Sequence, residues 1–505
     1  MKSVYLKLLR TEMSRLEKRG GFAMSGKLLR SLEASFTKPD YQIVLLLEKA
    51  RLAYLVGRWD ICLSILDKLE SQEALFEPDD RAYFYILNGL MHQGYGDLNQ
   101  ALTFLEIALE EALSGSGRRA AEAALEMASL FNRIGEQERG LDFLAQVEEQ
   151  LGKTPDRKLS AQLALERGLV RLREEDLAGA EECFRECLDG LEDKSPSILR
   201  GEGLRYLGIV ACMDSRPQEA LLPQRESLKC FLVLPYALGT AKAYSSLGQT
   251  CLQLGRYPEA RFFLEKAVEV CRKLGAEAEM AKFLGKLGLV YSKLGEYQKA
   301  IEYQKQDLDI SSRFGNYRAL AFSLRNLGLS HKDQGDLEQA VKYLRDSRDR
   351  FAELEDEAFQ VKADLDLAAA LLAHDRVMEA FGYLEDATAL LEKRIEVTPD
   401  HVHAKYYSGL VALKSGNLHR AESSLWQALE MCQSFSMQVR QAEVHFQLAK
   451  LYMAKDDKGA AKEELLLTYR LARAYSRTSL LTEVVQMLHE IEPDALFQAL
   501  LHSRF

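Results

Sequence analysis

A chain of 505 residues usually divides into several globular domains, yet no stretch rich in proline, glycine and serine separates parts of this one. None of its apolar runs approaches the roughly 18 residues of a membrane-spanning helix, and its eight cysteines are scattered without a paired framework, as in a reducing compartment. The formal net charge is -10. Together these features predict a soluble, cytoplasmic protein with no membrane span.

The first segment, residues 1–38, is basic. It holds nine Lys and Arg against three Glu, which gives +6 and leaves -16 for the rest of the chain. One interpretation is an N-terminal helical cap or degenerate repeat with a solvated basic face. The other is a docking arm for an acidic partner, a membrane surface or nucleic acid. Nucleic acid is the less favoured partner, because the segment is too short for a complete helix-turn-helix domain and carries no aromatic platform.

Residues 39–476 repeat with a period of about 40 residues. LGQTCLQLGRYPEARFF begins at Leu247, LGLVYSKLGEYQKAIEY at Leu287 and LGLSHKDQGDLEQAVKY at Leu327. Small residues at two fixed positions allow two helices to cross closely. The first series is Ala50, Gly89, Ala128, Gly168, Gly208, Gly248, Gly288, Gly328, Ala368, Gly409 and Ala449, and the second is Cys62, Ala101, Gly140, Ala180, Ala220, Ala260, Ala300, Ala340, Ala380, Ala421 and Ala461.

Within each repeat the apolar residues follow helical spacing, as in Leu287, Val290 and Leu294. A glycine such as Gly295 can then end the first helix in a left-handed conformation. Each repeat is therefore predicted to be a pair of helices joined by a short turn. Pro223 is the exception to the register, and we expect a disturbed first turn or a kink there.

These features resemble the tetratricopeptide repeat (TPR) family, whose pattern is matched by Gly288, Tyr291, Gly295 and Ala300. Repeats of 40 rather than 34 residues are similar to the Leu-Gly-Asn-repeat protein subgroup and to bacterial TPR regulators. The resemblance implies an all-α, right-handed α-solenoid of about 11 helix-turn-helix repeats over 39–476. Caps are expected at residues 1–38 and 477–505, with Phe497, Leu500 and Leu501 either completing the C-terminal cap or forming a docking tail.

The resemblance also implies that the first helix of each repeat lines a concave inner wall where a partner binds. Family positions transferred to this chain predict a basic strip, which would attract an acidic segment. Its residues are Arg205, Lys242, Lys282, Lys286, Arg325, Asn326, Lys332 and Lys362. The alternative is an ordinary solvated helical surface. Two apolar groups near the ends of the wall, Tyr83, Ile86, Leu90 and Leu125 and then Tyr406, Leu410, Phe446 and Met453, either anchor a ligand or pack against the next repeat.

No nucleotide-binding glycine loop, nucleophile elbow, HExxH or Cys-x-x-Cys pair occurs, so no enzyme activity, cofactor or metal is expected. The predicted function is a non-catalytic scaffold or adaptor that binds an acidic segment of a protein or peptide partner. The alternative is a regulatory or sensor module that binds a peptide or small ligand and acts on a partner in trans. Self-association through uncapped solenoid ends stays open, as does membership in a larger regulator.

Overall fold

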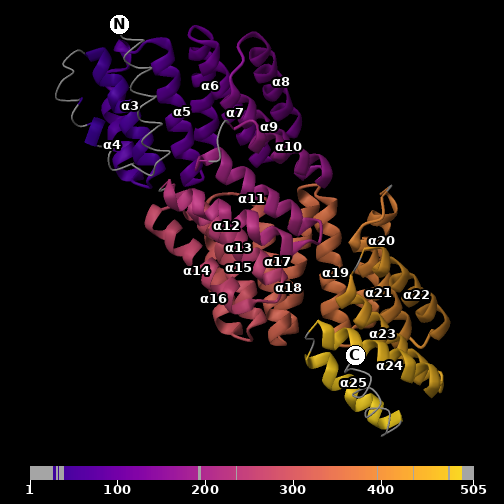
Figure 1. Ribbon diagram of the computed structural model, residues 1–505. Helices are drawn as coiled ribbons and strands as arrows, with labels where there is room; N and C mark the ends of the chain where they lie inside the picture. The colour runs from indigo at the N-terminus through magenta and orange to yellow at the C-terminus, as the bar shows by residue number, and fades with distance from the viewer. Residues whose placement is uncertain are drawn as a thin grey trace. The chain divides into compact units, whose positions relative to one another are not determined.

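The computed structural model describes residues 27–29, 32 and 39–491, apart from 192–194, 235, 395, 436 and 476–477. Over these residues the regular elements are 23 α-helices and one short 3-10 helix, with no strand (Figure 1). None of these helices is long and apolar enough to cross a membrane. The predictions for most of residues 1–38, and for Phe497, Leu500 and Leu501, lie outside the described residues.

Consecutive helices pack against each other in pairs, and each predicted repeat corresponds to one pair. In chain order the helices are α3(Pro39–Leu55), α4(Trp59–Glu70), α5(Pro78–Tyr95), α6(Leu98–Leu113), α7(Gly117–Ile134), α8(Gln137–Lys153), α9(Arg157–Arg173), α10(Leu177–Asp189), α11(Ile198–Met213), α12(Pro217–Val233), α13(Ala237–Gln253), α14(Tyr257–Leu274), α15(Glu277–Lys293), α16(Tyr297–Arg313), α17(Tyr317–Gln334), α18(Leu337–Glu353), α19(Glu357–Ala373), α20(Val377–Glu392), α21(Pro399–Lys414), α22(Leu418–Ser434), α23(Gln438–Ala454), α24(Lys458–Ala474) and α25(Thr478–Ile491). The all-α solenoid of helix pairs predicted from the sequence is confirmed.

The small residues lie where the two helices of a pair cross. A Cβ added to Gly328 on α17 would lie 2.7 Å from Leu344 Cγ on α18, so only a very small residue leaves room for that leucine. Gly335 then ends α17 in the left-handed conformation with φ 91°. At Pro223, α12 runs through the residue without a break, so the expected disturbed turn is absent, and the alternative, a kink, stays a prediction.

The chain forms two compact units, Met1–Gly315 and Asn316–Phe505, called unit 1 and unit 2 below. Unit 2 contains the helices from α17 to α25. Its last helix covers the apolar side of the final pair, where Leu480, Val484 and Leu488 are buried with Phe446 and Leu465. This helix therefore packs on the last helix pair, as expected of a C-terminal cap.

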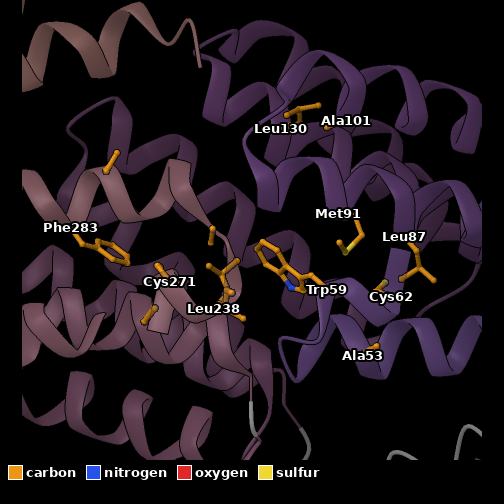
Figure 2. Packing of buried hydrophobic residues seen from close by; sticks show 14 of the residues in the cluster. Ala53, Trp59, Cys62, Leu87, Met91, Ala101, Leu130, Leu238, Cys271 and Phe283 are labelled. Carbon is orange, nitrogen blue, oxygen red and sulfur yellow. The ribbon is translucent and has the colours of Figure 1, made fainter. Parts of the chain in front are cut away.

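Unit 1 closes on itself: its first helix pairs contact its last ones. One hydrophobic core runs from Ile43 to Ile310 and joins residues of α3, α4 and α5 to residues of α13, α14 and α15. A Cβ on Gly57, in the turn before α4, would lie 3.0 Å from Ala237 Cβ and would overlap Leu274. In Figure 2, Trp59 extends from the first pair towards the helix that carries Leu238. The early and late helices of unit 1 therefore share one hydrophobic core.

Candidate functional site

The inner wall of unit 1 carries four of the predicted basic residues, on α11, α13 and α15. Arg205 is only 6% exposed. Its guanidinium lies 2.5 Å from Glu202 Oε2 and stacks 3.9 Å from the centre of the Tyr206 ring. A guanidinium held by a carboxylate and an aromatic face is largely satisfied within the wall. Arg205 therefore has limited capacity to bind a further anion.

Two predicted lysines surround Glu279, a buried residue at the start of α15. Lys282 Nζ lies 3.1 Å from Glu279 Oε1, and Arg133 of α7 lies 3.4 Å from the same oxygen. Burial alone would raise the pKa of Glu279, but Lys282, Lys242 and Arg133 together hold it well below its usual range. Glu279 is thus an ionised carboxylate that joins α7, of the third helix pair, to α15, of the last pair of unit 1.

Lys286, one turn further along α15, has a different environment. Its Nζ donates to Ser245 Oγ at 3.4 Å. Burial, with repulsion from Arg205 and Lys282, lowers the pKa of Lys286 to about 8. This lysine lies among other cations and forms no ion pair with a carboxylate in the described part of the chain.

The sequence analysis missed two carboxylates on the same wall, Glu126 of α7 and Glu166 of α9. Burial and the neighbouring Glu122 raise the pKa of Glu126 to about 7, and burial with Glu126 raises that of Glu166 to about 8. Gln162 Nε2 lies 3.5 Å from Glu126 Oε1. Neither carboxyl group forms an ion pair with any described lysine or arginine. Their spacing of exactly one repeat was the signal that could have revealed them.

The other four predicted residues belong to unit 2 and are considered by themselves. Arg325 Nε on α17 lies 2.7 Å from Asp366 Oδ2 on α19. Lys362 Nζ lies 4.5 Å from the centre of the Phe359 ring. Asn326 and Lys332 are half-buried on α17. Arg205, Lys282 and Arg325 are thus each paired with a carboxylate of their own wall.

Unit 2 also contains a cavity of about 260 Å³ between α21, α23 and α25. Tyr406 and Phe446, both predicted as apolar inner-wall positions, line it together with Leu480. Lys450 lies at its edge, 4.4 Å from the centre of the Phe446 ring and 3.8 Å from Glu483. Beside it, the Arg440 guanidinium stacks 4.7 Å from the Tyr406 ring centre. Glu443, Gln447 and Glu483 line the cavity as well, so it combines three aromatic or apolar side chains with charged and polar groups and has room for one side chain of a bound segment.

The described residues contain no cluster of three His, Cys, Asp or Glu side chains that could hold a metal ion. The eight cysteines are free thiols, and seven of them are buried. Burial raises the pKa of Cys432 to about 11, and a thiol of this kind is a poor nucleophile at neutral pH.

Solved structures of similar fold include a Rap protein complexed with competence and sporulation factor, with a TM-score of 0.54 and 12% identity. That match covers 74% of this chain and 99% of the Rap chain. The apo form of RapI gives a TM-score of 0.51 with 14% identity, covering 71% of this chain and 98% of RapI. At these identities the likeness concerns the fold alone. Among curated proteins, none matches the chain.

The family comparison concerns the central repeats. Residues 204–273 and 279–353 match the tetratricopeptide repeat family. These segments run from α11 to α18 and include the repeats quoted above from Leu247, Leu287 and Leu327. The same helix pairing continues on both sides of them. The chain therefore contains tetratricopeptide repeats.

Proposed function

We propose that this protein is a non-catalytic scaffold whose inner helical faces bind an extended segment of a partner protein. Tetratricopeptide repeats are interaction modules, and repeat solenoids bind partners on the wall formed by the first helix of each repeat. The observation that carries the proposal is the cavity of about 260 Å³ on that wall in unit 2, floored by Tyr406, Phe446 and Leu480. An apolar side chain of the partner would occupy it.

An acidic character of the partner segment is the finer part of the proposal. Lys332 and Lys362 lie on the inner helices α17 and α19. Lys362 has an aromatic neighbour rather than a carboxylate. Carboxylates of a bound segment would gain ion pairs with these ammonium groups, and part of that gain would be lost as salt screens the charges.

The test probes the intact chain with an array of peptides. Each acidic peptide contains one leucine or phenylalanine and is compared with a scrambled and a neutral version of itself. Acidic peptides with an apolar anchor should bind best, and binding should weaken with added salt. Phe446→Ala should weaken all of them. Lys362→Glu should weaken the acidic ones, whereas Lys393→Glu, at an exposed lysine at the end of α20, should leave binding unchanged. Equal binding of neutral and acidic peptides would contradict the acidic partner.

A second candidate function is a sensor that binds a peptide or small ligand and acts on a partner in trans. The ionisable side chains of Glu126, Glu166 and Lys286 on the inner wall of unit 1, which form no ion pair with described residues, favour it. The similar Rap structure contains competence and sporulation factor, and ligand binding within this fold is in line with such a function.

A further inference from the structure

Helix α22 of unit 2 carries an exposed tryptophan beside a hollow of about 360 Å³. Trp426 is 45% exposed, although an indole has a large apolar surface to bury. Residues three, four and seven positions apart lie on the same side of a helix. The hollow is lined by such a stripe of residues, all on α22: Ser423, Trp426, Gln427, Leu429, Glu430 and Gln433. It therefore belongs to the second helix of a pair and not to the inner wall.

An aromatic residue at this position is unusual for the chain. Trp426 lies five residues after Ala421, the second small residue of its repeat. The same position holds mostly charged residues in the earlier repeats: Asp67, Glu106, Ala145, Arg185, Arg225, Glu265, Lys305, Arg345 and Glu385. The packing of a helix pair therefore does not require the indole.

Hydrogen bonds hold the indole in place. Trp426 donates a hydrogen bond to the Tyr452 hydroxyl on α23. That hydroxyl donates in turn to Glu422 Oε1 at 3.2 Å, and Lys455 Nζ lies 2.5 Å from the other carboxylate oxygen of Glu422. The indole N–H is thus bonded within the protein. A ring fixed in this way loses little conformational freedom when a ligand contacts its exposed surface.

Carboxylates without a cationic partner lie in the hollow and on the preceding second helix. Glu430 stands one helical turn beyond the tryptophan. On α20, which packs on α21 as α22 does, Glu385 and Glu392 take two of the repeat positions that line the hollow. All three carboxylates are exposed, and no lysine or arginine in the described part of the chain forms an ion pair with them. On α24 the position of Glu430 is held by Arg470, so the negative surface extends towards α20.

We propose that this hollow binds an arginine side chain of a partner segment whose further cationic residues lie along α20. Charge complementarity with the three carboxylates selects a cationic segment. A guanidinium is planar and stacks on an aromatic face, for which tryptophan is the strongest partner. Its N–H groups can at the same time bond the Glu430 carboxylate and the side-chain oxygens of Gln427 and Gln433. A lysine ammonium would form the ion pair without the planar stacking.

This inference goes beyond the proposed function. The surface lies on second helices rather than on the inner wall, and its partner carries the opposite charge to the segment proposed for the cavity between α21, α23 and α25. Each site can therefore fail a test without affecting the other.

The experiment titrates the intact chain with an N-acetylated, C-amidated peptide in which arginines are separated by alanine and glycine. The arginine peptide should bind about tenfold more tightly than its citrulline version and about threefold more tightly than its lysine version. Binding should also reduce the quenching of Trp426 fluorescence by acrylamide. Trp59 is only 2% exposed and contributes little to that quenching.

Trp426→Ala should weaken binding about threefold or more, measured by calorimetry, because the stacking surface is lost while the charge of the chain stays the same. Trp426→Phe should restore part of the affinity. Glu430→Gln should weaken binding about threefold, through loss of one exposed ion pair. Glu490→Gln, at an exposed carboxylate of α25, removes the same charge and is the matched control, which should bind like the wild type.

Circular dichroism with thermal unfolding verifies that each variant is folded. The proposal is overturned if the citrulline peptide binds as well as the arginine peptide, or if Trp426→Ala binds like the wild type. Self-association of the free chain that Trp426→Ala abolishes, measured by sedimentation, would assign the hollow to a second copy of the chain and would also overturn it. Phe446→Ala separates the two sites, since it should weaken binding of the acidic peptides and leave the arginine titration unchanged.

Discussion

Arg348 of unit 2 bonds three carboxylates, those of Asp349, Asp386 and the buried Asp364, and the pair with Asp364 replaces an apolar contact between neighbouring repeats. Asp364 on α19 has no exposed surface, and its Oδ1 lies 3.1 Å from Arg348 Nε on α18. The positions one and two repeats earlier are Leu324 and Leu284. Burial raises the pKa of Asp364 to about 7 although Arg348 opposes the shift. The pair therefore holds a charge where the repeat pattern places a leucine.

Arg348→Met should lower the free energy of unfolding of unit 2 by about 3 kcal/mol at about pH 8, since removing one partner leaves a buried charge. The native state binds a proton at Asp364 that the unfolded chain has lost, so this group's contribution to stability falls as pH rises from about 4 to 7. The loss in the variant should consequently be smaller at about pH 5. Urea denaturation of the variant and the wild type at both pH values measures this loss of stability.

The control for this prediction is Arg350→Met on the same helix, which removes an exposed pair with Glu353 and should cost less than about 1 kcal/mol. Adding Asp364→Leu to Arg348→Met should restore most of the stability, because the site then resembles the leucines of the preceding repeats. An equal loss for Arg348→Met at both pH values would show that Asp364 does not carry the effect.

The structural role of a residue could be predicted well from the sequence where the same residue type recurs in every repeat, and poorly where it does not. The glycine and alanine positions were predictable, because the same crossing is built eleven times and each needs a small residue. The pairing of the basic wall was harder to foresee, although Glu202 with Arg205 and Glu279 with Lys282 share a three-residue spacing. Whether such neighbours form a pair or face outward depends on side-chain directions that the sequence leaves open.

At the scale of one helix, α12 contains two prolines in different positions. Pro217 stands in the first turn, where the missing N–H has no helical partner to lose, whereas Pro223 lies inside the helix and leaves the Glu219 carbonyl without its N–H donor. The sequence predicted a disturbance at Pro223. The helix continues instead, because its buried residues Ala220, Gln224 and Ser227 hold it against the neighbouring helices.

Pro223→Ala should therefore stabilise unit 1, by up to about 3 kcal/mol, since alanine restores the hydrogen bond and removes the clash. Slower hydrogen exchange of the α12 amides and a higher midpoint in urea would measure the gain. Pro217→Ala is the matched control in the same helix and should change little. If Pro223→Ala destabilised the protein, the proline ring would have to contribute packing that outweighs the lost hydrogen bond.

At the scale of a whole unit, the closure of unit 1 is the feature that the repeat pattern could not predict. The period defines each helix pair and its contact with the next pair. Whether the first pair meets the sixth depends on small rotations added over every pair, and no motif records their sum. Arg133 and Glu279, 146 residues apart in sequence, meet only because of it. The contact between Arg133 and Glu279 was unpredictable from the sequence for the same reason.

The closing contact can be broken without disturbing any helix pair. Leu274, at the end of α14, packs on the Gly57 turn and is 9% exposed. Leu274→Asp places a charge in that apolar contact, where burying it unpaired is costly. We expect the first pairs of unit 1 to separate from α13, α14 and α15 while every helix stays folded, because neighbouring pairs still support one another.

Trp59, which is almost fully buried in the core that spans this contact, reports the separation. In a Trp426→Phe background it is the remaining tryptophan of the chain. Leu274→Asp should shift its emission to longer wavelength and increase quenching by acrylamide, with unchanged helical circular dichroism. Leu232→Asp, at an exposed leucine of α12, should change neither. Unchanged emission in Leu274→Asp would mean that the first helix pairs bury Trp59 by themselves, through its contacts with Tyr54 and Tyr95, and would contradict this prediction.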